Sequence, residues 1–292
     1  MKKTLYAGFT IISVILFSFG CTNEQDTVAV SADGVKIRFT SQGRGEPAIV
    51  FVHGWSNNKS IWDGQVSHFS EKYKVVAVDL AGFGVSGDNR KNWTMESFAD
   101  DVVAVMDKLN LKQVVLVGFS MGAPVVIETA IKASGRVAGV VLVDDLHNIE
   151  MKYPPQMIAY IDSAFMDLVM NPTVEKLVGG GFVKANPEES FERVRAMLNG
   201  ASQIGWRESL NNTLRWYNED CIVSLKKVSV PVTAINSDRQ PTNVDAFREY
   251  VPSFQARIIP GAGHVVMWDA PEEFNRLLEE SIREFINKSD AE

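Results

Sequence analysis

Short runs of apolar, β-branched residues recur through most of the chain and alternate with segments of helical periodicity. Six of these runs have the length of a strand, and they read PAIVFVHG, KVVAVDL, QVVLVGFS, VAGVVLVDD, PVTAIN and ARIIPG. Continuous apolar runs of this kind are typical of strands buried on both faces of a parallel sheet. Upstream of them, TVAV and VKIRFT flank a turn at Asp33 and Gly34, which predicts an antiparallel hairpin at the start of the fold.

The segments between the runs carry apolar stripes at helical spacing. One stripe consists of Phe98, Val102, Val105, Met106 and Leu109. The last helix is predicted to begin at Pro271. Its apolar face consists of Phe274, Leu277, Leu278, Ile282, Phe285 and Ile286. Strands that alternate with helices predict an α/β fold with a mostly parallel sheet.

The interval between about residues 145 and 220 breaks this alternation. It contains mainly helix-like segments, loops and a run of three glycines at 179–181, and no core strand is evident. It is also rich in methionine and aromatic residues, namely Met151, Met157, Phe165, Met166, Met170, Phe182, Met197, Trp206 and Trp216. We interpret the interval as an inserted cap whose apolar side chains pack on the core and also line a pocket.

The N-terminus has a composition of its own. Lys2 and Lys3 precede an apolar run at 7–19 that ends at Gly20 and Cys21, which is the pattern of a signal peptide. The run is shorter than the roughly 20 apolar residues of a membrane-spanning helix. The sequence FSFGC resembles a bacterial lipobox, so we expect export and lipidation of Cys21. The protein would then be held at a bacterial membrane of the cell envelope by its N-terminal lipid.

Length, composition and charge limit the possible functions. The 292 residues are 46% hydrophobic and 22% charged, as expected of one large domain with an insertion. We therefore predict a signal peptide at 1–21, a tether at 22–26, a core at 27–146 and 219–292, and a cap at 147–218. The formal charge of -7 argues against nucleic acid as a partner. Cys221 would be the one cysteine besides Cys21, and we expect it to be buried and structural.

The strongest chemical signal is a G-x-S-x-G motif formed by Gly118, Ser120 and Gly122. It follows a predicted strand directly and precedes a predicted helix, which is the context of a nucleophile elbow. Glycines are needed there because side chains at the flanking positions would collide with the backbone of the tight turn. The motif predicts Ser120 as a nucleophile with an exposed Oγ.

A serine nucleophile needs a base, and the chain has four histidines. His264 is the best candidate, because it lies in a loop between the last predicted strand and the last helix. His53 follows the first buried strand and is expected to be structural. His68 and His147 have no comparable position.

The acid that orients the base should follow Ser120 and precede His264 in the chain. Asp238, at the end of the strand PVTAINS, fits this order and would fix the tautomer of the imidazole. Asp144 and Asp145, at the end of the preceding strand, remain as alternatives, although either could instead cap a turn.

The negative oxygen that develops during acyl transfer must be met by backbone N–H donors. The residue after the nucleophile, Met121, supplies one donor. The turn after PAIVFVHG supplies the second, for which Trp55 is the candidate.

These motifs together resemble the α/β-hydrolase superfamily, in its serine hydrolase branch, over nearly everything after residue 27. The matching segments, in the order of the family, are HGW at 53–55, Trp62, DLAGFGVSG at 79–87, GFSMG at 118–122, SDRQP at 237–241 and GAGH at 261–264. The resemblance implies an eight-stranded, mostly parallel sheet flanked by helices, with a helical cap inserted after the sixth strand. It also implies Ser120, Asp238 and His264 as the triad, with Trp55 and Met121 as oxyanion donors.

The resemblance narrows the chemistry without choosing a substrate. Related epoxide hydrolases and haloalkane dehalogenases have Asp at the position of Ser120. No clustered His and Cys set indicates a metal, and no cofactor is implied. The predicted function is hydrolysis of a small carboxylic ester through an acyl-enzyme. Hydrolysis of a carbon–carbon bond and cofactor-free haloperoxidase chemistry would use the same triad. A lipid-tethered binding protein without turnover is a further alternative, against which the intact triad argues.

Overall fold

The computed structural model describes residues 27–198 and 202–289. The predicted signal peptide, Cys21 and the tether at 22–26 lie outside the described residues. No helix in these two ranges is long and apolar enough to cross a membrane.

The fold is built on one eight-stranded sheet. In chain order the strands are β1 (Val28–Val30), β2 (Lys36–Gln42), β3 (Ala48–Val52), β4 (Val75–Val78), β5 (Val114–Phe119), β6 (Val137–Val143), β7 (Val232–Ser237) and β8 (Gln255–Ile259). Their order in the sheet is β1-β2-β4-β3-β5-β6-β7-β8. The hairpin β1–β2 and the pair β2–β4 are antiparallel, and all other pairs are parallel. The predicted hairpin and the mostly parallel sheet are thus confirmed.

The central strands are buried on both faces, as their continuous apolar sequences predict. Val50 and Val52 of β3 belong to one core cluster, whereas Ile49 and Phe51, which alternate with them, belong to the other. This split follows from the pleat, which directs successive side chains to opposite faces.

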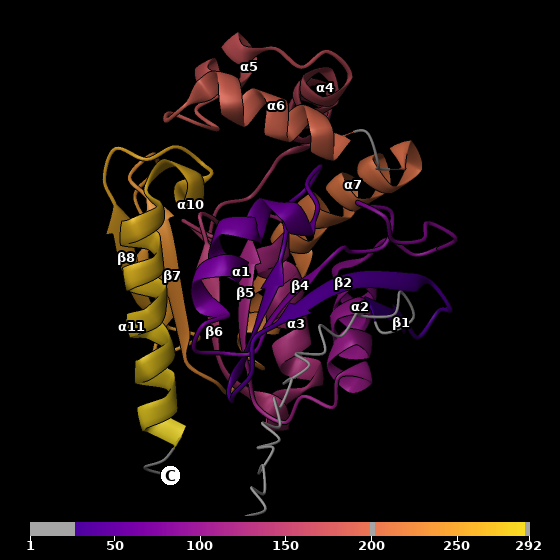
Figure 1. The fold of residues 1–292 in the computed structure, drawn as a ribbon. Helices are drawn as coiled ribbons and strands as arrows, with labels where there is room; N and C mark the ends of the chain where they lie inside the picture. The colour runs from indigo at the N-terminus through magenta and orange to yellow at the C-terminus, as the bar shows by residue number, and fades with distance from the viewer. Residues whose placement is uncertain (1–26, 199–201, 290–292) are drawn as a thin grey trace, which may run out of the picture.

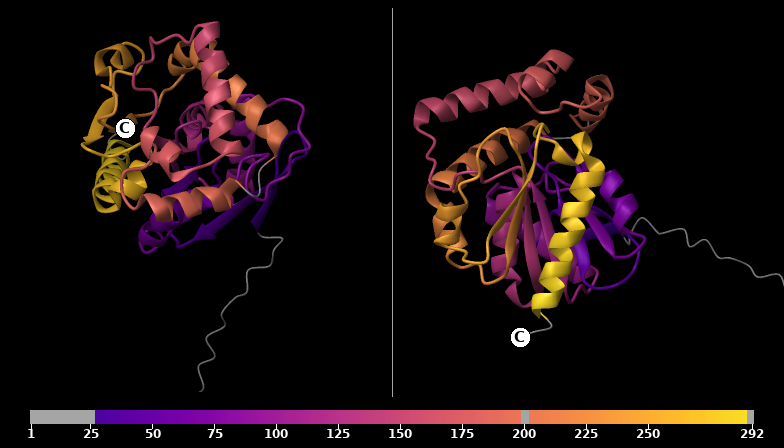
Figure 2. Two further views of the ribbon diagram at one scale, coloured as in Figure 1. Left: turned by 90° about the horizontal axis from the view of Figure 1, so that it is seen from above. Right: turned by 90° about the vertical axis from the view of Figure 1, so that its left-hand side faces the viewer.

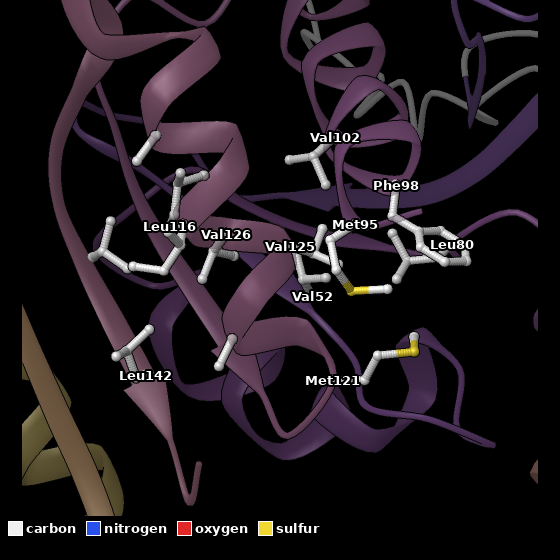
Figure 3. Packing of buried hydrophobic residues seen from close by; sticks show 14 of the residues in the cluster. Val52, Leu80, Met95, Phe98, Val102, Leu116, Met121, Val125, Val126 and Leu142 are labelled. Carbon is white, nitrogen blue, oxygen red and sulfur yellow. The ribbon is translucent and has the colours of Figure 1, made fainter. Parts of the chain in front are cut away.

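Helices cover both faces of the sheet (Figure 1). The helices of the core are α1 (Asp63–Phe69), α2 (Met95–Lys108), α3 (Gly122–Lys132), α8 (Cys221–Leu225), α9 (Val244–Arg248), α10 (Val266–Asp269) and α11 (Pro271–Ser289), with 3-10 turns at Lys59–Trp62 and Ser134–Arg136. The stripe residues Phe98 and Val102 of α2 pack near Val125 of α3, above the strand residues Val52 and Leu116 (Figure 3). On the opposite face, α11 lies along the strands (Figure 2).

The predicted helical insertion after β6 is confirmed, and its described residues form four helices. They are α4 (Pro155–Met170), α5 (Val174–Gly179), α6 (Pro187–Leu198) and α7 (Gln203–Glu219). Figures 1 and 2 show α4, α5 and α6 gathered over one end of the sheet, whereas α7 runs from there down beside the core. The insertion is anchored by α7, whose buried Trp216 donates a hydrogen bond from Nε1 to Glu128 of α3 at 2.7 Å. The cap therefore covers the carboxyl ends of the parallel strands, where ligands bind in open α/β sheets.

Candidate active site

Ser120 lies in the tight turn between β5 and α3, as the G-x-S-x-G motif predicts. Its φ of 49° is in the left-handed region, which a non-glycine residue occupies only under strain. The Ser120 N–H donates to the carbonyl of Val143 at the end of the neighbouring β6. The serine is thereby held at the end of the sheet, partly exposed to the cavity beneath the cap.

The two flanking glycines are required by close backbone approach. A Cβ at Gly118 would lie 2.2 Å from the carbonyl oxygen of Gly122, and a Cβ at Gly122 would lie 2.6 Å from the carbonyl oxygen of Val52. Real Cβ atoms do not approach so closely, because such contacts are deep inside van der Waals repulsion. A side chain at either position would therefore force the backbone of the elbow to shift.

The acid beside His264 is Asp144. The His264 Nδ1 and the Asp144 Oδ2 are 2.7 Å apart, and the same carboxylate accepts the N–H of Ser237 on Oδ1 at 2.7 Å. Asp144 directly follows β6 and has a φ of 45°, a strained turn that directs its side chain along the sheet edge toward the histidine. It is 3% exposed, so its interaction with the imidazole is shielded from water.

Asp238, predicted as the acid, is corrected by this geometry. It is an exposed residue one position beyond β7, and its carboxylate accepts the N–H of Gly261 at 3.0 Å. Within the described residues it makes no hydrogen bond to His264. The physical reason is the point at which β7 ends. Its last residue is the buried Ser237, which contacts Asp144, so Asp238 is the first residue beyond the strand and turns outward to the loop that precedes the histidine.

The surroundings of Asp144 favour its ionised form over its protonated form. Burial alone would raise its pKa, but hydrogen bonds from His147, His264 and the Ser237 N–H hold the pKa well below its usual range. His147 Nε2 is 3.5 Å from Oδ1, and the guanidinium of Arg239 is 3.8 Å from Oδ2. Asp144 therefore remains a carboxylate near neutral pH and can stabilise a proton on His264.

The loop that carries His264 is hydrogen-bonded to the cap. The N–H groups of His264 and Val265 donate to the carbonyls of Gly181 and Phe182, each at 2.9 Å. The carboxylate of Asp269 accepts the N–H of Gly263 at 2.6 Å and, from the cap, that of Ala185 at 2.7 Å. Since these bonds join segments about 80 residues apart in sequence, the position of the histidine depends on the position of the cap.

Two other histidines, His53 and His68, lie outside this arrangement. His53 is fully buried; its Nε2 accepts the N–H of Leu80 at 3.1 Å, so its Nδ1 donates to the carbonyl of Gly54 at 2.7 Å. Burial lowers the pKa of His53 to about 4, which keeps it neutral. His68 is exposed on α1. The structural role predicted for His53 agrees with these contacts.

Trp55 and Met121 line the cavity beside Ser120. In the described part of the chain neither backbone N–H donates to a protein acceptor. The loop that carries Trp55 lies close to Ser120. Gly54 permits this approach, because a Cβ on it would lie 3.0 Å from the Ser120 Cβ. The indole of Trp55 is fixed by a hydrogen bond from Nε1 to the carbonyl of Trp206 in α7, at 2.6 Å. Two free N–H groups thus lie next to the serine.

Beneath the cap lies a cavity of about 560 Å³ that Ser120, Asp144 and His264 all border. No hydrogen bond joins Ser120 to His264 in the described structure; such bonds are often long when no substrate is bound. The walls contributed by the insertion are mostly apolar, with Met151, Met157, Tyr160, Ile161, Ala164, Phe165 and Phe182 among them. Other apolar residues of the insertion, Met197, Trp206 and Trp216, are buried in packing instead. The interval therefore has both expected roles.

Three polar residues in or near the cavity were missed or undervalued in the sequence interpretation. Asp145 was weighed only as an alternative acid, and it accepts a hydrogen bond from the hydroxyl of Tyr217. Arg239 was noted only as part of the segment SDRQP, without a role of its own, and nothing in the sequence singled out Asp269. Cys221 is buried as expected, and burial raises the pKa of its thiol to about 12. No cluster of metal ligands occurs within residues 27–198 and 202–289.

Comparison with known proteins supports what this geometry indicates. Residues 47–271 match the model of the alpha/beta hydrolase fold family. The chain belongs to this family. A putative non-heme chloroperoxidase of Synechocystis is 29% identical over 264 residues, which cover 84% of this chain and 94% of the relative. The 3-oxoadipate enol-lactonase 2 of Acinetobacter baylyi is 23% identical, with 88% and 96% covered.

Solved structures agree on the fold of this hydrolase. An esterase from Thermogutta terrifontis aligns with a TM-score of 0.74 at 23% identity, over 88% of this chain and 98% of the esterase. An esterase from Exiguobacterium antarcticum gives a TM-score of 0.76 at 21% identity, over 88% and 99%. The prediction of an enzyme of the α/β-hydrolase family is confirmed.

Proposed function

We propose that the protein is a serine hydrolase that cleaves small carboxylic esters through an acyl-enzyme, with Ser120 as nucleophile and His264 as base. The observation that carries the proposal is the 2.7 Å contact between His264 Nδ1 and the buried Asp144, in the same cavity as the strained Ser120. A buried carboxylate on Nδ1 leaves Nε2 as the nitrogen that takes the proton of the serine.

The reaction follows from these positions. Ser120 Oγ attacks the ester carbonyl while its proton passes to His264 Nε2, and the negative oxygen of the tetrahedral intermediate accepts from the free N–H groups of Trp55 and Met121. The intermediate collapses, and the alcohol leaves with the proton from His264. A water molecule, deprotonated by the same nitrogen, then attacks the acyl-enzyme and releases the acid and Ser120. Asp144 stabilises the imidazolium in both halves.

The cavity supports a small and moderately apolar substrate. Its volume of about 560 Å³ is within the range of small-molecule sites, and cap residues such as Met157 and Phe165 offer apolar contact to an acyl or alcohol chain. Esterases among the similar structures and an enol-lactonase among the relatives act on carboxylic esters or lactones by their names.

The test is hydrolysis of a series of short-chain aryl esters by the purified protein and by Ser120→Ala. The proposal predicts turnover by the parent and none above background by the variant. Release of an acid and an alcohol in equal amounts distinguishes ester hydrolysis from cleavage of a carbon–carbon bond. A folded parent that hydrolyses no ester in the series would contradict the proposal.

We further propose that the chain is exported and anchored at a bacterial membrane by a lipid on Cys21. This rests on the two N-terminal lysines, the short apolar run and the FSFGC sequence. Fractionation of cells that express the parent or Cys21→Ala tests it. The parent should sediment with membranes and the variant should be soluble; membrane association of both would refute a role of the lipid.

A further inference from the structure

Asp145 is a carboxylate of the active-site cavity that the triad does not use. It directly follows Asp144, yet the two side chains diverge, because Asp144 reaches His264 and Asp145 reaches Tyr217 of α7. The divergence depends on backbone strain on both sides, since Asp144 has a φ of 45° and Leu146 a φ of 50°. Non-glycine residues in this region cost roughly 1–2 kcal/mol each and persist mainly at functional sites.

Among the described residues no lysine or arginine pairs with Asp145, and the nearby imidazoles of His264 and His147 attract its charge without contacting it. Both of its oxygens accept from the Tyr217 hydroxyl, at 2.9 and 2.8 Å, and Oδ1 also accepts the N–H of Leu146 at 2.6 Å. It forms no ion pair within the described residues. Arg239, the one arginine or lysine among the described residues that line the cavity, donates to the carbonyl of Gly180 at 3.0 Å and faces Asp144. A carboxylate has about four acceptor sites, so Asp145 retains free capacity.

Aromatic rings stand beside this carboxylate. Tyr217 and Tyr153 have ring centroids 5.7 Å apart, and both line the cavity together with Asp145. Burial raises the pKa of Asp145 to about 6, against the lowering effect of the Tyr217 hydrogen bond, so the carboxylate is still mostly charged near neutral pH. A charge kept in such a place without a partner destabilises the fold, whereas a bound cation would offset the penalty.

We propose that Asp145, with Tyr153 and Tyr217, is a subsite for a protonated amine of the substrate. A carboxylate beside aromatic rings attracts an ammonium group by charge, and the rings offer it cation–π contact. The esters that the enzyme prefers would therefore carry an amine on the acyl or the alcohol part. This inference rests on the proposed function, because it names the substrate class for the same cavity.

The test compares esters that differ only in a protonated nitrogen. One pair is 4-(dimethylamino)butyl butyrate and its carbon isostere 5-methylhexyl butyrate, with the amine in the alcohol. The other is hexyl 5-(dimethylamino)pentanoate and hexyl 6-methylheptanoate, with the amine in the acid. Each is assayed with the parent, with Asp145→Asn and with Asp238→Asn, a control that removes an exposed carboxylate outside the cavity.

For at least one pair, the parent should show a kcat/KM about tenfold or more higher for the amine ester, the size expected of one charge-assisted contact. Asp145→Asn should lose this preference through KM while its rate on the carbon isostere stays within about threefold of the parent. Asp238→Asn should keep the preference. No preference in the parent, or an equal loss on both members of a pair in Asp145→Asn, would overturn the proposal.

A binding measurement separates this proposal from the proposed function. Calorimetric titration of N,N-dimethylhexylamine into Ser120→Ala, and into the double variant Ser120→Ala/Asp145→Asn, needs no turnover. Binding to the first that weakens about tenfold in the second supports the amine subsite even if no ester is hydrolysed. Equal binding to both, or none to either, refutes the subsite and leaves ester hydrolysis to its own assay.

Discussion

Replacement of Asp144 by asparagine tests the corrected triad most sharply among the single substitutions. The carboxylate lies 2.7 Å from His264 Nδ1 and is 3% exposed. At this separation an imidazolium and a carboxylate attract by about 6 kcal/mol with an effective dielectric constant of about 20. Asparagine removes this attraction and also offers an N–H to Nδ1, which favours the wrong tautomer.

We therefore expect kcat of Asp144→Asn to fall by about 10³- to 10⁴-fold, as for the loss of a triad aspartate in other serine hydrolases. This corresponds to about 4 to 5.5 kcal/mol of transition-state stabilisation, slightly below the full attraction. Asp238→Asn, which changes an exposed carboxylate one strand away, should stay within about threefold of the parent.

Initial rates on an aryl ester, with circular dichroism to confirm folding, provide the assay. A large loss in Asp238→Asn together with a small one in Asp144→Asn would show instead that the loop after β7 supplies the acid during turnover.

Three further substitutions have definite expected outcomes. Asp269→Asn should slow acylation of Ser120 about tenfold with a shift of only a few degrees in melting temperature, because it weakens the bonds that join the cap to the His264 loop; stopped-flow burst kinetics measure the acylation, and an unchanged rate would contradict the coupling. Asp145→Asn should stabilise the fold at neutral pH, since the pKa of Asp145 is raised from 3.8 to about 6 in the folded state. Ionisation of Asp145 destabilises the folded parent by at most about 3 kcal/mol as the pH rises through about 4 to 6. The variant should therefore be more stable than the parent in urea denaturation at neutral pH and equally stable at low pH. A gain in stability that does not depend on pH would exclude this cause. Gly122→Ala should lose about 1–3 kcal/mol or fail to fold, because its Cβ would meet the carbonyl of Val52 at 2.6 Å; wild-type stability in thermal denaturation would show that the elbow is less tightly packed than described.

The sheet and the nucleophile could be predicted from the sequence because their signals are local. The runs that became β3 to β8 are apolar over the length of a strand, and the spacing of Gly118, Ser120 and Gly122 directly reflects the backbone conformation that the turn demands. The hairpin and the position of the cap follow equally from local signals, namely a turn at Asp33 and Gly34 and the absence of strand-like runs in the insertion.

The identity of the acid could not be decided in the same way. Asp144 and Asp238 both follow parallel strands of the same sheet. They differ in the φ angle of the aspartate and in the residue at which the preceding strand ends. Asp144 has a φ of 45°, which turns it toward His264, whereas β7 extends through Ser237 and leaves Asp238 beyond the sheet. Chain order favoured Asp238, but a strained φ at an aspartate has no reliable signature in sequence. Asp269 escaped notice for a related reason, because its partners lie about 80 residues away in the chain.

Activation of Ser120 by His264 and Asp144 can be tested by intact-mass analysis of the purified protein after reaction with a fluorophosphonate, which modifies activated serines. Parent, Ser120→Ala, Asp144→Asn and Asp238→Asn are compared. We predict one adduct on the parent, none on Ser120→Ala, a strongly slowed reaction of Asp144→Asn and a normal reaction of Asp238→Asn. No adduct on the folded parent, or an adduct that persists in Ser120→Ala, would contradict this prediction.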